Sequence, residues 1–353
     1  MTCGLQDRLN CTGGEQIKML ALVFISSVLM GLAGAAMAQD VESFYRGKQV
    51  RIIVGFSSGG GYDQYGRLLA RHISKHIPGN PNVVVQNMPG AASLKSLQYL
   101  DAGAAPDGTT IVTFNPGLIL GSLTSPQKTP VDFRNFSWIG NISEDVRVCF
   151  TWHARGMRDW KTFLARDNVV FGNTGVGTSA YLDDRMLLML FGVKLKMVQG
   201  YPGSADKKIA IESGELDGDC GSWTSLPFEW LREKKIDIHV RFSQTIPADM
   251  PKDIPWASDF LDSETKKQTF RLLVSGAVIG RPFLMSKAVP ADRVNALRAA
   301  FDATMKDPEF LADAEKQRLL VGPDTGEAVA KRIVDIYSAP PEVIARARDI
   351  AGE

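Results

Sequence analysis

Residues 50–69 read Val-Arg-Ile-Ile-Val-Gly-Phe-Ser-Ser-Gly-Gly-Gly-Tyr-Asp-Gln-Tyr-Gly-Arg-Leu-Leu and predict a buried strand, a glycine-rich turn and the start of a helix. The first backbone amides of a helix carry a partial positive charge, and glycines without a Cβ let a ligand approach the main chain. No lysine or arginine lies between Phe56 and Gly66. We therefore expect this turn to bind a small anion mainly through backbone N–H groups and hydroxyls.

A second turn of the same kind follows a second predicted strand. Residues 173–179, Asn-Thr-Gly-Val-Gly-Thr-Ser, come after the apolar segment 168–173 and open a helix that reaches Leu190. In open α/β sheets, ligands bind beyond the carboxyl ends of the strands, and both turns lie at that end of their own sheet. Two such ends facing each other would enclose one small anion, an interpretation that we favour over two unrelated turns.

Short apolar runs alternate with helical stretches along the chain, which is typical of an α/β fold. The lack of polar alternation in these runs indicates mainly parallel sheets with helices on both faces. The expected strands of a first unit are residues 50–54, 82–86 and 110–114, and those of a second unit are residues 148–151, 168–173, 196–199, 216–220 and 236–242. The C-terminal part is helical, and we expect its helices to pack onto the first unit.

The N-terminus has the pattern of a secretory signal peptide. Arg8 and Lys18 flank or precede an apolar run from Met19 to Ala33, and Ala36-Met37-Ala38 resembles a cleavage site. We expect residues 1–38 to be a signal peptide that directs export to the periplasm and is cleaved after Ala38. The chain has 353 residues and a formal net charge of +1, which allows two modest domains and argues against a nucleic-acid partner.

Cysteine usage leaves one question open. After cleavage of the signal peptide, Cys149 and Cys220 would be the remaining cysteines. An oxidising compartment permits a disulfide between them, and the pattern is equally consistent with two buried thiols in separate strands. Neither cysteine is expected to be catalytic.

Neither a cofactor nor a metal is predicted. The glycines at 59–61 lack the Gly-x-Gly-x-x-Gly spacing of a dinucleotide site, and no Gly-Lys-Ser/Thr follows them as in a phosphate-binding loop. His72 and His76 have the spacing of metal ligands on one helix face, but without a third ligand we interpret them as part of a solvated helix flank. Asp63 is expected to cap its helix, and a ligand contact is its alternative or additional role.

Several motifs occur in a fixed order along the chain. The first is Gly55-Phe56-Ser57-Ser58-Gly59-Gly60-Gly61-Tyr62-Asp63, and the second is Asn87-Met88-Pro89-Gly90-Ala91-Ala92. Gly175-Val176-Gly177-Thr178 and Tyr201-Pro202-Gly203-Ser204 follow in the second unit. Together these motifs resemble those of the Bug-type receptors of tripartite tricarboxylate transporters, which are periplasmic solute-binding proteins. Ser57, Ser58 and Tyr62 depart from the family's pattern, so the family's ligand specificity cannot be carried over.

The resemblance implies a two-domain clamshell of the periplasmic-binding-protein-like α/β class. Domain 1 would consist of residues 39–143 and 263–353, and domain 2 of residues 144–262. A small carboxylate would be held largely by main-chain amides of the two glycine loops, with Tyr62 and Tyr201 as aromatic walls. The expected ligand-binding residues are Phe56, Ser57, Ser58, Gly60, Gly61, Tyr62, Asp63, Thr174, Gly177, Thr178, Ser179 and Tyr201.

The expected function is the capture of a small organic carboxylate and its delivery to membrane permease subunits, by a monomer that catalyses no reaction. One alternative is a receptor that reports to a membrane sensor kinase, which would use the same binding physics. The other alternative is a carboxylate-processing enzyme. It would need a nucleophile and a base, or a metal, and the presence of only 4 histidines disfavours it.

Overall fold

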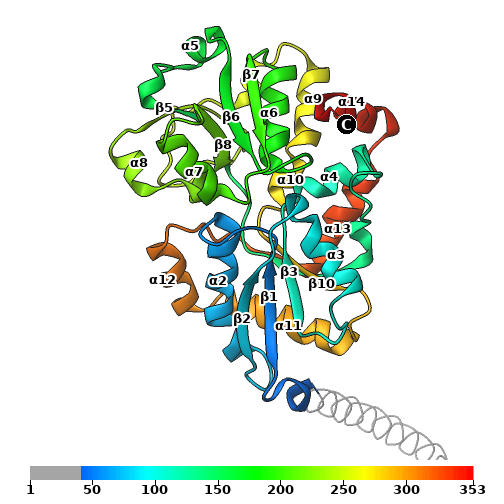
Figure 1. The fold of residues 1–353 in the computed structure, drawn as a ribbon. Coiled ribbons are helices and arrows are strands. Elements are labelled where there is room, and N and C mark those ends of the chain that lie inside the picture. Colours follow the sequence, from blue (N-terminus) through cyan, green and yellow to red (C-terminus); the bar gives the residue numbers. More distant parts are fainter. Residues whose placement is uncertain (1–40, 353) are drawn as a thin grey trace, which may run out of the picture.

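The computed structural model describes residues 41–352, which form two lobes, each built on one β-sheet with helices packed against it (Figure 1). The predicted signal peptide lies outside the described residues. The first sheet has the order β11-β4-β10-β3-β1-β2, with strands β1 Gln49–Val54, β2 Asn82–Asn87, β3 Thr110–Thr113, β4 Phe136–Asn141, β10 Pro282–Ser286 and β11 Asp324–Thr325. The second has the order β7-β6-β8-β5-β9, with strands β5 Arg147–Trp152, β6 Val169–Asn173, β7 Leu195–Gln199, β8 Gly218–Ser222 and β9 Ile236–Arg241. The predicted α/β class with two sheet-based units is confirmed.

Both sheets are mixed rather than mainly parallel. Strand β1 runs parallel to β2 and β3, and β6 runs parallel to β7 and β8, as the alternation of strands and helices predicts. Strand β10 is antiparallel to β3 and β4, and β5 is antiparallel to β8 and β9. The chain leaves the first lobe after β4 and returns into β10. These two strands lie side by side, and they run in opposite directions because β4 carries the chain out of the lobe and β10 carries it back.

Strand β1 is buried on both faces, which explains its continuous apolar sequence. Ile52 and Val54 belong to the core on the side of α2, whereas Ile53 belongs to the core on the other side. A Cβ on Gly66 would lie 2.9 Å from a methyl carbon of Val54, so this glycine lets α2 pack closely on β1. The helices around this sheet are α2 Gly61–Ile73, α3 Leu94–Ala102, α4 Gly117–Thr124, α11 Ala291–Thr304, α12 Pro308–Lys316 and α13 Gly326–Tyr337.

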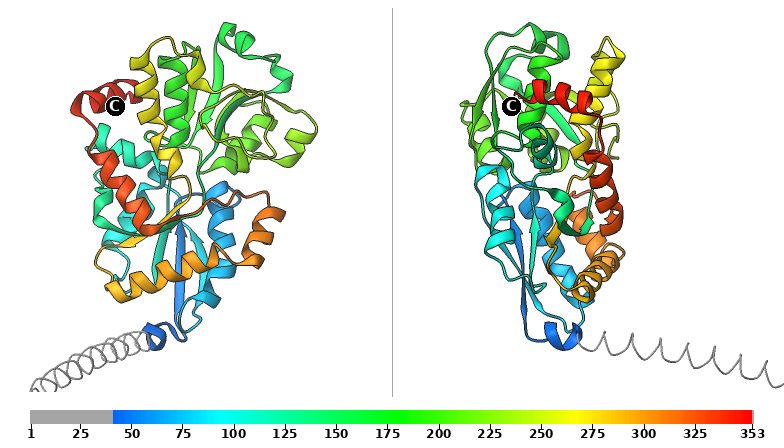
Figure 2. Two further views of the ribbon diagram at one scale, coloured as in Figure 1. Left: turned by 180° about the vertical axis from the view of Figure 1, so that it is seen from behind. Right: turned by 90° about the vertical axis from the view of Figure 1, so that its right-hand side faces the viewer.

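The last helix packs differently from the three C-terminal helices before it, which pack onto the first unit as predicted. Helices α11, α12 and α13 do so, but α14 packs against α6 and α9 in the second lobe (Figure 2). Ala347 and Ala351 of α14 are fully buried in the core of that lobe. The predicted domain boundaries stay a prediction. The remaining helices are α5 Trp160–Ala165, α6 Ser179–Met189, α7 Ser204–Glu212, α8 Phe228–Arg232, α9 Glu264–Leu273, α10 Ser275–Val278 and α14 Pro341–Ala351.

A disulfide joins two neighbouring strands of the second sheet. Cys149 on β5 lies directly opposite Cys220 on β8, and their Cα atoms are 4.1 Å apart. Both residues are fully buried. The structure therefore decides between the two alternatives that the sequence left open.

Loss of this disulfide is expected to destabilise the second lobe. The bond spans 71 residues, and the chain-entropy model gives a loop of this size about 4 kcal/mol. The measurement is urea unfolding of the wild type and of a Cys149→Ala/Cys220→Ala variant, followed by tryptophan fluorescence. The variant should unfold at a clearly lower urea concentration under oxidising conditions. Equal midpoints under those conditions would contradict a stabilising bond.

Candidate functional site

The glycine turn between β1 and α2 is held in shape by Asp63. The Asp63 carboxylate accepts hydrogen bonds of 2.9 Å from the Gly59 amide, from Arg67 Nε and from Asn87 Nδ2. Burial favours the neutral acid, but these hydrogen bonds outweigh burial and lower the pKa of Asp63. The Asp63 side chain, at the start of α2, thus stabilises the glycine turn that precedes this helix.

The same turn contacts the second lobe at the start of α7. Ser57 Oγ donates a hydrogen bond of 2.8 Å to Asp206 Oδ2. A Cβ on Gly60 would lie 2.9 Å from Ser204 Oγ, and a Cβ on Gly61 would lie 2.3 Å from Ser225 Oγ. These close approaches show that the two lobes are closed on each other at the glycine turn.

The start of α6 is engaged by Asn115, which follows β3 in the first lobe. Asn115 Oδ1 accepts hydrogen bonds from the Ser179 amide at 3.0 Å and from Ser179 Oγ at 2.9 Å, as well as from the Gly117 amide at 2.8 Å. Thr178 Oγ1 accepts a hydrogen bond from the Tyr181 amide and caps the helix. The polar groups of Thr178 and Ser179 are therefore already paired within the protein, although both residues were predicted to meet a ligand.

A cavity of about 60 Å³ lies between the lobes at the place where α2, α6 and α7 begin. Its wall includes Gly60 and Gly61 at the start of α2, Ala180 from α6 and Ser204 from α7. Helix N-termini favour negative charge because their first amides are not paired within the helix. The wall also contains four buried charged residues: Asp145, Arg147, Lys207 and Arg281.

A larger cavity of about 650 Å³ adjoins the small one, since Phe56 and Thr174 contribute to the walls of both. Most of its remaining wall comes from residues 89–94 before α3, the glycine loop at 174–176 and the segment 199–202. Within the described residues, Lys128 is the charged side chain of this wall, and it is exposed. The volume falls within the range of about 300–1,000 Å³ that is usual for small-molecule sites.

The predicted site residues divide into two groups. Those that line one or both cavities are Phe56, Gly60, Gly61, Tyr62, Thr174 and Tyr201. Those that line neither are Ser57, Ser58, Asp63, Gly177, Thr178 and Ser179. Contact of any of these residues with a ligand stays a prediction.

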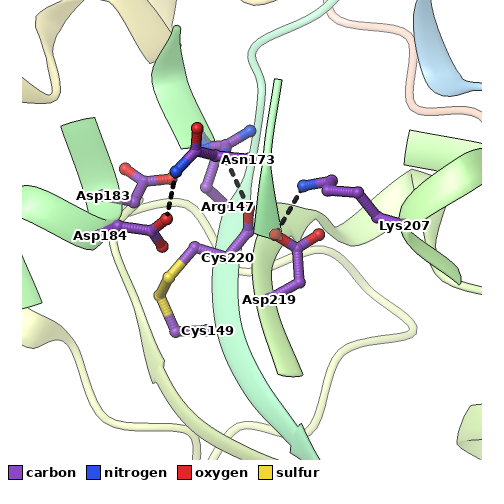
Figure 3. Close-up of a disulfide and its surroundings, with 8 residues drawn as sticks. All are labelled: Arg147, Cys149, Asn173, Asp183, Asp184, Lys207, Asp219 and Cys220. Atoms are coloured by element: carbon purple, nitrogen blue, oxygen red, sulfur yellow. Dashed lines mark hydrogen bonds and ion pairs between the residues drawn. A yellow bond between two sulfur atoms is a disulfide. The ribbon is translucent and has the colours of Figure 1, made fainter. Parts of the chain in front are cut away.

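The buried charges were not predicted from the sequence, because the glycine turn indicated an anion held without a cation. Arg147 donates to Asp183 through Nε and to Asp145 through Nη1, the latter at 3.1 Å. Lys207 Nζ pairs with Asp219 (Figure 3). Arg147 stands within the apolar run 146–150, and a charge in such a run is a signal of a buried pair. Its partners, however, cannot be read from the sequence.

Burial controls the protonation of the acids near the small cavity. For Asp145, burial favours the neutral acid, but the guanidinium groups of Arg281 and Arg147 outweigh burial and lower its pKa. Burial raises the pKa of Asp183 to about 7 against the attraction of Arg147. Burial also raises the pKa of Asp184 well above its usual value, and Asn173 Nδ2 donates to this side chain at 3.0 Å. Near neutral pH the cluster therefore carries less negative charge than its number of carboxyl groups suggests.

His72 of α2, and His76 in the short turn that follows it, pair with acids at α12 and at its N-cap. His72 Nε2 lies 2.9 Å from Asp313, and His76 Nε2 lies 2.8 Å from Asp307. Among residues 41–352, no group of three or more histidine, cysteine or acidic side chains is arranged to hold a metal ion. In the same range, no helix has the length and apolar character needed to cross a bilayer.

Gly117→Ala is expected to force the lobes apart. A Cβ at this position would lie 2.6 Å from the Gly177 carbonyl oxygen and 2.6 Å from the Ser179 amide nitrogen, and backbone atoms cannot rotate away as a side chain can. Small-angle X-ray scattering should give a larger radius of gyration than for the wild type. Gly322→Ala is the matched control, because a Cβ there has no atom within 4 Å. An unchanged radius for Gly117→Ala would contradict this close approach.

Asp183→Asn is expected to remove a pH-dependent part of the stability. Burial raises the pKa of Asp183 from 3.8 to about 7, so the contribution of this group is fully present below about pH 4 and is lost as the pH rises through 7. The measurement is the free energy of unfolding of the wild type and the variant in urea from pH 4 to pH 8. The wild type should lose stability relative to the variant across this range, and a constant difference would rule out the shift.

Comparisons with known proteins give distant relatives and a fold. No protein-family model matches the chain. A UPF0065 protein of Agrobacterium vitis, encoded in the TAR-I ttuE-ttuC' intergenic region, is 29% identical over 210 residues, which are 57% of this chain and 58% of the relative. The match thus spans less than two thirds of that relative's length.

Solved structures match over most of the chain. The periplasmic binding protein BugD is 20% identical with a TM-score of 0.71, and the match covers 87% of this chain and 99% of BugD. MatC of Rhodopseudomonas palustris, solved with bound malate, is 20% identical with a TM-score of 0.69 and coverages of 86% and 99%. The chain therefore has the two-lobed periplasmic-binding-protein-like fold, and its predicted resemblance to the Bug-type solute-binding receptors is confirmed.

Proposed function

We propose that this protein is a periplasmic receptor that captures a small organic carboxylate between its two lobes and delivers it to the permease subunits of a tripartite tricarboxylate-type transporter. The observation that carries the proposal is the small cavity at which α2, α6 and α7 begin, because three helix N-termini favour an anionic guest. The likeness to BugD, and to MatC with its bound malate, supports the same conclusion.

Binding is coupled to closure of the lobes. The amides of Gly60 and Gly61 belong to the first lobe, whereas those of Ala180 and Ser204 belong to the second. An anion contacts all of them only in the closed arrangement, so it shifts the population towards that arrangement. A micromolar ligand needs about 8 kcal/mol, and hydrogen bonds to a charged group contribute about 1.5–3 kcal/mol each, so a handful of such bonds offsets much of the cost of closing.

The walls favour a ligand with an apolar or aromatic body. Tyr62 stacks on Phe56 with a centroid distance of 4.9 Å beside the small cavity. Tyr201 contributes an aromatic ring to the larger cavity. Aromatic rings bury large apolar areas and stack with one another. A compact, highly charged acid such as citrate would leave these surfaces without a partner.

The test is a thermal-shift panel of organic acids. We expect aromatic and longer-chain monocarboxylates and dicarboxylates to raise the melting temperature more than citrate does, because their bodies fill the larger cavity. The primary amides of the best acids serve as controls and should give smaller shifts. A larger shift with citrate would overturn the ligand preference, and the absence of a shift with every acid would overturn the receptor function.

A further inference from the structure

Two of the cations at the small cavity are already paired. Arg147 uses Nε for Asp183, Nη1 for Asp145 and Nη2 for the Cys220 carbonyl oxygen. Lys207 Nζ pairs with Asp219 inside the second lobe. A new anion would have to compete with these contacts, so neither side chain is free to bind it.

Arg281 differs from both because one of its nitrogen atoms has no hydrogen-bond partner among the described residues. Its Nη2 donates to Asp145 at 3.0 Å and to Ser222 Oγ. Its Nε has no hydrogen-bond partner within the part of the chain that the structure describes, although the residue is only 2% exposed. Buried donors are nearly always paired, because an unpaired one loses its water without compensation. The unpaired donor therefore points to a missing acceptor.

The guanidinium group of Arg281 is held at the start of α2. Its central carbon lies 4.5 Å from the ring centre of Tyr62 and 5.2 Å from that of Tyr65, which are cation–π distances. A Cβ on Gly61 would lie 3.3 Å from Nη2. The helix N-terminus and the guanidinium group thus share one wall of the small cavity, and both favour negative charge.

The ion pairs leave this end of the cluster positive. Asp145 is shared between Arg281 and Arg147, and Arg147 is shared between Asp145 and Asp183. The charges therefore alternate from Arg281 through Asp145 to Arg147, and Asp183, whose pKa is raised to about 7, adds only part of a negative charge at neutral pH. The charged partner of Arg281 is Asp145, which it shares with Arg147. The charge of Arg281 is therefore only partly balanced, and a bound anion beside it would balance the rest.

We infer that Arg281 binds the carboxylate head of the ligand in the small cavity, while the body of the ligand lies in the larger cavity. This inference rests on the proposed function. A volume of about 60 Å³ suits a head group, because sites for whole small molecules usually measure about 300–1,000 Å³. The ligand class is an acid with a terminal carboxylate and an uncharged body next to it. The described wall of the larger cavity is uncharged except for Lys128, and this side chain is exposed.

The experiment compares each acid that binds the wild type with its primary amide, by isothermal titration calorimetry. The amide keeps the shape of the head but not its charge. The variant is Arg281→Met/Asp145→Asn, which removes the cation together with its partner, because a lone buried carboxylate would destabilise the fold. Arg155→Met/Asp217→Asn is the matched control, because it also removes an ion pair but lines neither cavity. Melting temperatures verify that both variants are folded.

The double variant should lose at least tenfold in affinity for the acid and less than threefold for the amide, so that it no longer prefers the acid. Arg155→Met/Asp217→Asn should keep the preference of the wild type. A folded double variant that still prefers the acid by the wild-type factor would overturn the role of Arg281 and leave the receptor function standing. Failure of the wild type to bind any acid would instead overturn the proposed function.

Discussion

The placement of the two lobes depends on one buried carboxylate, that of Asp145. It lies in the segment that connects β4 to β5 and is 2% exposed. It pairs with Arg147 at the start of β5 and with Arg281 just before β10, where the chain returns to the first lobe. Its amide also donates to the Ala277 carbonyl oxygen. A Cβ on Gly280 would lie 2.1 Å from this amide nitrogen, so the two connecting segments can touch only where one of them has glycine.

The same charged residues lie in the segments that connect the two lobes and in the wall of the small cavity. Arg281 belongs to the connection between the lobes and also to the wall of the small cavity, and Asp145 has both positions as well. Buried ion pairs add little net stability, but removal of one partner is strongly destabilising. This network therefore specifies how the connecting segments meet more than it adds to the stability of either lobe. It also places charge beside the cavity without a residue from the glycine loops.

Local sequence patterns predicted the elements whose structure depends on residues close together in the chain. The apolar run of β1, the glycine turn and the helix that follows are fixed by neighbours in the chain. The sequence predicted the five strands of the second sheet but only β1, β2 and β3 of the first, and it missed β4, β10 and β11. Strand β10 was missed because it begins with Pro282 and pairs antiparallel at the crossing. The pairing of Asp145 with Arg281 joins residues 136 positions apart. No periodicity or motif reports such a contact, and the engagement of Ser179 by Asn115 was hidden for the same reason.

The path of the C-terminus has a mechanical consequence. Helix α13 packs on β4 in the first lobe, and α14 packs on α6 and α9 in the second (Figure 2). Arg185 of α6 donates a hydrogen bond to the Ile350 carbonyl oxygen of α14. Arg348 of α14 donates a hydrogen bond to the Thr124 carbonyl oxygen at the end of α4. The short link at residues 338–340 is thus a third strap, besides the two segments around Asp145. Three connections of fixed length allow the lobes to rotate about one hinge axis that passes close to all three. They resist rotation of one lobe over the other about any other axis.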